Sequence, residues 1–88
     1  MIKTELTIQN KLGLHARPAA MFVQEAARFE SSIMVSKDGV EVNGKSVMGM
    51  MMLAAEHGSS LCLVIKGKDE SQALEALKKL FDNKFNEE

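Results

Sequence analysis

The amino-acid sequence predicts an α+β two-layer sandwich with the element order βαββαβα. Polar and apolar residues alternate in the first segment, and after residue 17 the apolar residues recur with the period of a helix. Further on, Asp38-Gly39 and Asn43-Gly44 separate short apolar segments, as turns between strands do. Because three helices cannot all be buried in a chain of 88 residues, the simplest arrangement is one sheet with its helices on one face.

The first half of the chain contains a predicted strand and a predicted helix. Residues 2–8 alternate between apolar and polar types, which is typical of a half-buried strand, and residues 10–13 form a loop. Pro18 has no N–H and fits only in the first turn of a helix, so a helix begins next to Arg17. Five apolar residues share one face of that helix: Ala19, Phe22, Val23, Ala26 and Phe29.

The middle of the chain is predicted to hold a hairpin and a short helix. Residues 33–36 and 40–42 are the two strands, and the short turn between them implies antiparallel pairing. Ser46 is placed as the N-cap of a short helix that runs from residue 47 to about residue 55. Gly58 is the predicted residue just after the C-cap of this helix.

The last part of the chain is predicted to form a central strand and a long helix. Residues 61–65 are a nearly continuous apolar run, which is typical of a central strand. Asp69 is the predicted cap of the last helix, with Gln72 at the capping-box position. Residues 83–88 are expected to fray. The apolar stripe of the helix consists of Ala73, Leu74, Leu77, Leu80 and Phe81.

Composition indicates a small globular protein of the cytoplasm with a single domain over residues 1–88. Hydrophobic residues make up 45% and charged residues 26%, and the net charge of −1 predicts no direct binding of nucleic acid or membrane surfaces. The single cysteine, Cys62, allows no internal disulfide. The charged N-terminal segment is unlike a signal peptide, and no apolar run approaches the length of a membrane span. His15 and His57, without a carboxylate cluster, predict no metal site.

His15 is the candidate acceptor of a phosphoryl group. It stands at the mouth of the first predicted helix, where Ala16, Arg17 and Pro18 form the first turn. Free N–H groups and the helix dipole at such a start bind anions, and Arg17 adds donors suited to phosphate oxygens. We expect both to favour neutral imidazole, which is a good nucleophile toward phosphorus. Phosphoryl transfer depends mostly on positioning and charge neutralisation, and these residues supply both.

An alternative role for these residues is structural. A histidine near a helix start is more often a cap or a surface residue, and an isolated arginine is usually a solvated charge. The joint spacing of His15, Arg17 and Pro18 favours an anion site over that alternative without excluding it. A small interaction domain without chemistry is therefore the competing hypothesis from the residues alone.

The run Leu14-His15-Ala16-Arg17-Pro18-Ala19 resembles the active-site signature of the HPr family, the histidine-containing phosphocarriers of the phosphoenolpyruvate–sugar phosphotransferase system. The resemblance covers the whole chain. It implies an open-faced β-sandwich with a four-stranded antiparallel sheet and three helices on one face. It also implies that the δ1 nitrogen of His15 accepts phosphoryl from enzyme I, assisted by Arg17, and passes it to IIA components of sugar permeases. Such a protein is a stoichiometric carrier without a cofactor rather than an enzyme, and a monomer suits it.

Ser46 carries a second resemblance. Besides capping a helix, it matches the regulatory serine that HPr kinase/phosphorylase phosphorylates in some HPr proteins. The resemblance implies that the modified form charges poorly with enzyme I and acts with a catabolite-control transcription factor. A regulatory paralogue, of nitrogen or catabolite-control type, is therefore the alternative function. His15 excludes only those paralogues that lack the active-site histidine.

Methionines dominate the short middle helix. Four of the seven methionines lie in residues 48–52, and consecutive helical positions cannot all face one core. Filling of the core is the structural alternative for such a cluster. With the family in view, we expect Met48 and Met51, together with Val47 and Ala20, to dock the partner proteins.

Overall fold

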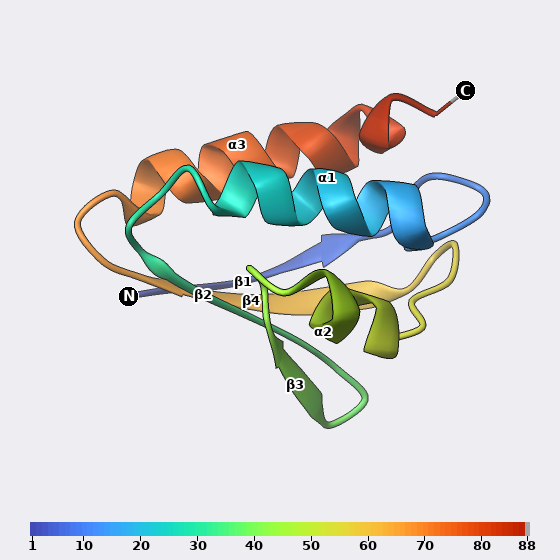
Figure 1. Ribbon diagram of the computed structural model, residues 1–88, viewed down its shortest axis with the longest axis horizontal. Helices are drawn as coiled ribbons and strands as arrows, with labels where there is room; N and C mark the ends of the chain where they lie inside the picture. The colour runs from blue at the N-terminus through green and yellow to red at the C-terminus, as the bar shows by residue number, and fades with distance from the viewer. Residues whose placement is uncertain (88) are drawn as a thin grey trace.

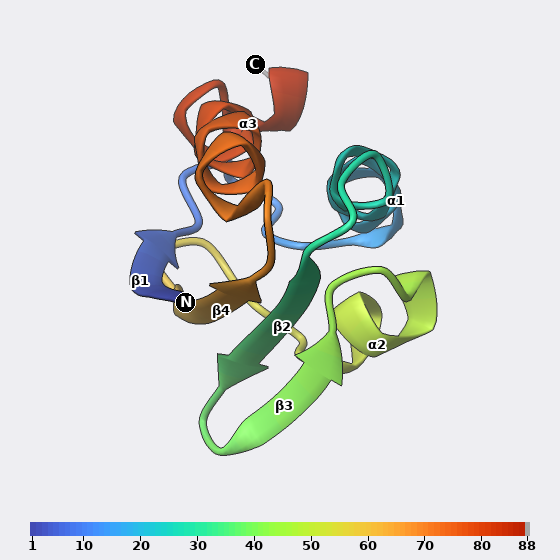
Figure 2. The ribbon, with the colours of Figure 1, turned by 90° about the vertical axis from the view of Figure 1, so that its left-hand side faces the viewer.

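The computed structural model describes residues 1–87, and its elements follow the predicted order βαββαβα. The four strands form one antiparallel sheet in the order β1-β4-β2-β3. The three helices lie on one face of this sheet (Figures 1 and 2), so the predicted fold class is confirmed. The elements are β1 (Ile2–Thr7), α1 (Ala16–Ala26), β2 (Ser32–Lys37), β3 (Val40–Asn43), α2 (Val47–Met52), β4 (Ser60–Lys66), α3 (Glu70–Asp82) and the 3-10 helix η1 (Lys84–Asn86).

The sheet has one covered face and one open face. Along β4, the central strand that the apolar run predicts, Leu61, Leu63 and Ile65 are fully buried under the helices. The residues between them, including Cys62, are only half-buried because they point to the face that no helix covers. The core therefore lies between the sheet and the helix layer.

Helices α1 and α3 pack over the sheet side by side (Figure 2). The predicted stripe of α3 is confirmed, with Leu77 and Phe81 buried in the core. Phe22 of α1 meets Phe81 edge to face, with ring centroids 6.2 Å apart. Helix α1 ends at Ala26, so Phe29 packs from the turn that follows the helix rather than from its predicted face.

Helix α2 is shorter than predicted. It ends at Met52, with Leu53 as its C-cap, because Ala54 adopts the left-handed conformation with a φ of 49°. This turn lets both Leu53 and Ala55 reach the core, where each is only 4% exposed. Gly58 is therefore not the residue after the C-cap. Its N–H instead donates to the carbonyl of Ile8 at 2.9 Å and joins two loops.

Asp69 occupies the N-cap position of α3 but does not cap the helix with its side chain, contrary to the prediction. Its carboxylate accepts hydrogen bonds from the N–H of Glu30 at 2.9 Å and from the N–H and hydroxyl of Ser31. The hydrogen bond from the Ser31 hydroxyl is the largest cause that holds the pKa of Asp69 below its ordinary value. The carboxylate thus serves the loop between α1 and β2, whose donors would otherwise lack a protein acceptor.

The segment after α3 forms the 3-10 helix η1 and packs on the domain, so the predicted fraying is wrong for these residues. Lys84, Phe85 and Asn86 all have positive φ, between 53° and 60°, and turn the chain back toward the domain. Phe85 is fully buried and its ring centroid lies 5.1 Å from that of Phe81. The fraying predicted for Glu88 concerns a residue outside the described range. Within residues 1–87, no helix is long and apolar enough to cross a membrane.

Candidate functional site

His15 is the N-cap residue of α1, at the helix start that the sequence predicts. Its backbone is extended, with φ −82° and ψ −171°, and its carbonyl accepts the first helical hydrogen bond from Ala19 at 3.0 Å. The imidazole makes no capping bond to the helix, and the side chain is 38% exposed. The ring is therefore not used as a cap and remains accessible to a second molecule.

The first turn of α1, which follows His15 directly, carries hydrogen-bond donors. Ala16 and Arg17 are the first two helical residues, so their N–H groups have no acceptor within the helix. Pro18 is buried in the same turn, where its missing N–H costs nothing. Arg17 is exposed, and within residues 1–87 no hydrogen bond or ion pair holds its guanidinium. Two backbone donors and one cation are thus gathered beside His15, an arrangement suited to a phosphate.

The loop before His15 is fixed by its own hydrogen bonds. The buried Asn10 donates from Nδ2 to the carbonyl of Gly13 at 2.7 Å, and the N–H of Leu14 donates to the carbonyl of Ala55 at 2.8 Å. Gly13 has a φ of +72°, and a Cβ at this position would lie 2.5 Å from the Ala55 oxygen. Only glycine fits at this position. The close approach of the loop to Ala55 therefore fixes the backbone that leads into His15.

A carboxylate that the sequence reasoning missed lies against the histidine. Oε2 of Glu87 is 2.7 Å from Nε2 of His15, and Oε1 accepts a hydrogen bond from Nδ2 of Asn10 at 2.8 Å. Burial acts to raise the pKa of Glu87, but hydrogen bonds from Asn10 and His15 and attraction to His15 and Arg17 together lower it. The carboxylate is therefore kept ionised beside the imidazole. The sequence had suggested that only positive groups surround the ring, and the structure adds this negative one.

Ser46 caps α2 as predicted. Its Oγ accepts a hydrogen bond from the N–H of Gly49 at 3.0 Å, and its carbonyl accepts one from Met50. The side chain is half-buried. The neighbouring Lys45 donates from Nζ to the carbonyl of Phe29 at 2.7 Å, which joins the start of α2 to the turn after α1. The hydroxyl already has a structural role, and it stands where a helix start favours negative charge.

Known proteins share this sequence and this fold. A family model described as the PTS HPr component phosphorylation site matches residues 2–83. The chain belongs to the HPr family. The Phosphocarrier protein HPr of Treponema pallidum (strain Nichols) is 51% identical over 88 residues, which is all of both chains. A crystal structure of HPr-C-His from Thermoanaerobacter tengcongensis superposes with a TM-score of 0.95 at 49% identity, covering 100% of this chain and 99% of the other.

A second kind of relative is also similar. The crystal structure of Crh, a Bacillus subtilis protein named for catabolite repression, has a TM-score of 0.75 and 45% identity, covering 96% of this chain and 97% of the other. In that structure Crh is a dimer with a swapped domain. Both phosphocarriers and a catabolite-repression protein are thus relatives of this HPr family member.

The predicted docking residues of this HPr family member differ in exposure. Met48 is 78% exposed, Met51 is 45% and Val47 is 37%, whereas Ala20 is half-buried. Met50 is fully buried, so one methionine of the cluster fills the core and its neighbours do not. Other large apolar side chains that the sequence reasoning did not select are also exposed, namely Met1, Leu12, Val40 and Met52. Helices α1 and α2 pack against each other. The helix that begins at the candidate site and the helix that carries the exposed methionines are therefore neighbours in the helix layer.

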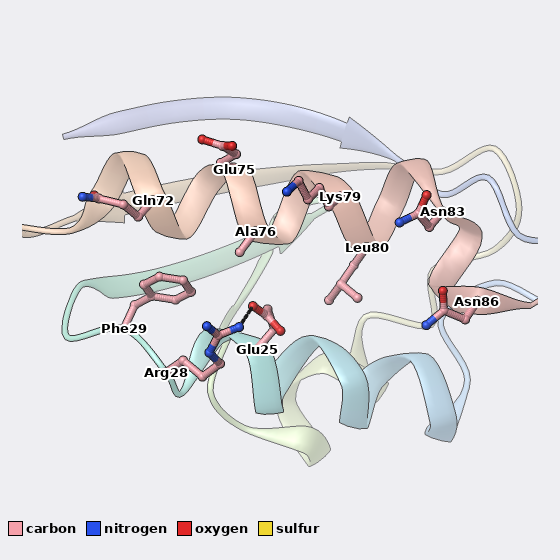
Figure 3. Close-up of a pocket in the computed structure, with 10 residues that line it drawn as sticks. All are labelled: Glu25, Arg28, Phe29, Gln72, Glu75, Ala76, Lys79, Leu80, Asn83 and Asn86. Atoms are coloured by element: carbon pink, nitrogen blue, oxygen red, sulfur yellow. Dashed lines mark hydrogen bonds and ion pairs between the residues drawn. The ribbon is translucent and has the colours of Figure 1, made fainter.

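A groove elsewhere on the molecule does not include the site. A groove of about 500 Å³ runs between α1 and α3 (Figure 3), with Phe29 and Leu80 among its apolar walls. Its charged residues carry both signs, and the Glu25–Arg28 ion pair lies on one rim. None of the predicted site residues lines it. Across residues 1–87, no group of three metal-ligating side chains is found either.

Proposed function

We propose that this protein is a phosphocarrier whose His15 accepts a phosphoryl group from phospho-enzyme I and passes it to IIA components of sugar permeases. The observation that carries the proposal is the accessible imidazole at the start of α1, in a chain of the HPr family. The N–H groups of Ala16 and Arg17, which have no acceptor within the helix, follow it in the first turn. These are the features that a transient phosphohistidine needs.

Each residue of the first turn has a separate role in this proposal. His15 supplies the nucleophile, and its δ1 nitrogen is the atom that carries phosphate in the family. Arg17 offsets charge on the phosphoryl oxygens, because its guanidinium is exposed beside the site. Ala16 and Arg17 offer backbone donors, while Pro18 fixes the helix start. In this proposal the protein acts as a stoichiometric carrier rather than an enzyme, with no cofactor.

We infer further that the carrier works in the cytoplasm as a single domain and as a monomer. A monomer can present the His15 face to several partners in turn. Dimers occur among its relatives, since Crh forms a swapped dimer and the HPr of Thermoanaerobacter tengcongensis also crystallises as a dimer. Size-exclusion chromatography with light scattering tests this inference, and a dimer at micromolar concentration would contradict it.

The experiment for the main function follows the phosphoryl group through both transfers. The protein is incubated with phosphoenolpyruvate, magnesium and enzyme I, and a purified IIA domain is then added. Intact-mass spectra should show one phosphoryl group gained by this protein and then transferred to the IIA domain. Charging without onward transfer would contradict the permease part of the proposal.

Ser46 is the proposed regulatory site. Its hydroxyl lies at the start of α2, and the exposed Met48 and Met51 are on the same helix, so a phosphate there would add charge next to the docking surface. HPr kinase/phosphorylase with ATP should add an acid-stable phosphate that is absent from Ser46→Ala. The modified form should charge more slowly with enzyme I and bind a catabolite-control transcription factor. Absence of modification by an active kinase would overturn this part.

The similarity to Crh favours one second candidate, a regulatory paralogue that acts as a phosphorylation-dependent binding module. In that case the exposed side chains of α2 would matter more than His15. The two functions differ in one measurement, because a pure binding module would bind its regulator without being charged by enzyme I. Rapid charging at His15 therefore favours the carrier.

A further inference from the structure

The tail after α3 brings Glu87 to His15 on a fixed support. Phe85 is fully buried against Phe81, and three successive left-handed residues turn the backbone between α3 and Glu87. Such a conformation is unfavourable for residues other than glycine, so packing of the Phe85 ring must stabilise it. The packing of Phe85 in the core therefore fixes the position of Glu87 next to the imidazole.

Both oxygens of the Glu87 carboxylate have separate partners. Oε1 accepts from Nδ2 of Asn10 at 2.8 Å, and Oε2 lies 2.7 Å from Nε2 of His15. Asn10 is fully buried, and its Nδ2 also donates to the carbonyl of Gly13. Both partners of Nδ2 are acceptors, so the NH₂ group of Asn10, and not its carbonyl oxygen, must face them. Asn10 therefore fixes which carboxylate oxygen faces the imidazole.

We propose that Glu87 is a positioning residue that holds His15 in the tautomer with the proton on Nε2 and the lone pair on Nδ1. An ionised carboxylate only accepts hydrogen bonds, so the ring nitrogen next to it must donate. In a neutral imidazole, a proton on Nε2 leaves Nδ1 as the free nucleophile. The ring is thereby prepared for attack through one defined atom.

The transfer step then needs no separate base. This step rests on the proposed carrier function. The Nδ1 lone pair forms a bond to the phosphorus of the donor's phosphohistidine, and the donor's N–P bond breaks with its electron pair returning to the donor ring. The proton on Nε2 stays in place, and the positive charge that develops on the His15 ring faces the Glu87 carboxylate. Discharge to an acceptor reverses these bond changes.

Glu87→Gln is the sharpest test because it keeps the shape of the side chain and changes its donors. Asn10 still requires an acceptor, so the amide oxygen of the glutamine should face Asn10 and its NH₂ should face Nε2 of His15. The NH₂ group donates, and it would favour the opposite tautomer with the proton on Nδ1. Glu41→Gln on the edge strand β3 makes the same charge change away from the site and serves as the matched control.

Two readouts are compared at a pH at which imidazole is neutral. The ¹⁵N chemical shifts of His15 report the tautomer in the unphosphorylated protein, and intact mass reports the rate of charging by enzyme I. We expect wild type and Glu41→Gln to hold the proton on Nε2. Glu87→Gln should move it to Nδ1 and slow charging about tenfold, the effect of a hydrogen bond to a charged group worth at least about 1.4 kcal/mol.

The outcomes separate this inference from the carrier function. An unchanged tautomer or an unchanged rate in Glu87→Gln would overturn the positioning role, even if wild-type protein charges normally. A wild-type protein that never charges would overturn the carrier function, while the ¹⁵N shifts would still report the tautomer. If Glu87→Gln fails to fold, Glu87→Ala is used instead, and it should give a mixture of both tautomers. A single Nε2–H tautomer in that variant would overturn the inference.

Discussion

The N–H of Leu14 donates a hydrogen bond to the carbonyl of Ala55 at 2.8 Å, which joins the loop before His15 to the segment after α2. The two residues are both buried, and Gly13 beside them approaches the same carbonyl. The candidate acceptor site and the exposed methionine helix are therefore positioned by one shared contact. A change at this contact should affect both the stability of the fold and the charging of His15.

Gly13→Ala is expected to destabilise the fold more than a glycine substitution with open space around it. Gly13 and Gly58 both have positive φ, which costs an alanine about 1–2 kcal/mol. Only at Gly13 would the new Cβ also meet an atom, the Ala55 oxygen at 2.5 Å. Urea unfolding of Gly13→Ala and Gly58→Ala measures the difference. An equal decrease in the free energy of unfolding of the two variants would mean that the loop before His15 can shift to accommodate the new Cβ.

Ser46→Ala should lower the free energy of unfolding by about 1 kcal/mol, because the Gly49 N–H loses its acceptor. Ser46→Asp should keep that stability, since a carboxylate also caps and suits the positive end of the helix. It should nevertheless slow charging by enzyme I through the added negative charge. Ser71→Ala, at an exposed position of α3, is the control. A fall in melting temperature for Ser46→Asp would show that the cap requires a hydroxyl.

Asp69 should make stability depend on pH in the acid range. Hydrogen bonds from Ser31 and Glu30 lower its pKa in the folded protein below the ordinary value of about 3.9. The unfolded state then binds the proton more readily, so this stabilisation is present above that value. It is lost as the pH falls through the lower pKa of the folded protein.

Asp69→Asn should therefore be less stable than wild type at neutral pH and should lose less stability on further acidification below about pH 4. Thermal melts across that range, with Asp82→Asn as the control at the other end of α3, measure the effect. Parallel stability curves for Asp69→Asn and wild type would contradict the role given to this carboxylate.

Arg17→Ala should slow phosphoryl transfer far more than it lowers stability. The guanidinium is exposed, and although the Glu87 carboxylate attracts it, no hydrogen bond or ion pair holds it within the described part of the chain, so the stability change should stay within about 0.5 kcal/mol. Loss of a group that stabilises transition-state charge costs on the order of 100-fold in rate. Arg17→Lys should recover only part of this, because an ammonium lacks the planar fork. An unchanged rate in Arg17→Ala would show that the backbone donors suffice.

The sequence predicted the parts of this protein whose signals are local. Alternation along residues 2–8, the apolar run at residues 61–65 and the stripe of α3 all reflect burial of one face. The start of α1 was also predictable, because Pro18 restricts it to a few residues. His15 and Arg17 could be selected together because the whole helix start lies within four residues.

The errors arose where distant contacts decide the local structure. Ala54 ends α2 in a left-handed conformation without being a glycine, because the chain must turn there to bury its neighbours. Asp69 serves a loop 38 residues away instead of its own helix. Glu87 reaches His15 across 72 residues through the buried Phe85. The one sequence signal that could have indicated this contact was an aromatic residue, Phe85, in an otherwise polar tail.

The most direct test of the central claim is the intact mass of the protein after incubation with phosphoenolpyruvate, magnesium and enzyme I. We predict one added phosphoryl group that is lost in acid, as a phosphoramidate is, and that is absent from a folded His15→Ala variant. Ser46→Ala should still gain it. An acid-stable phosphate, or an added mass that persists in His15→Ala, would contradict the assignment of His15 as the acceptor.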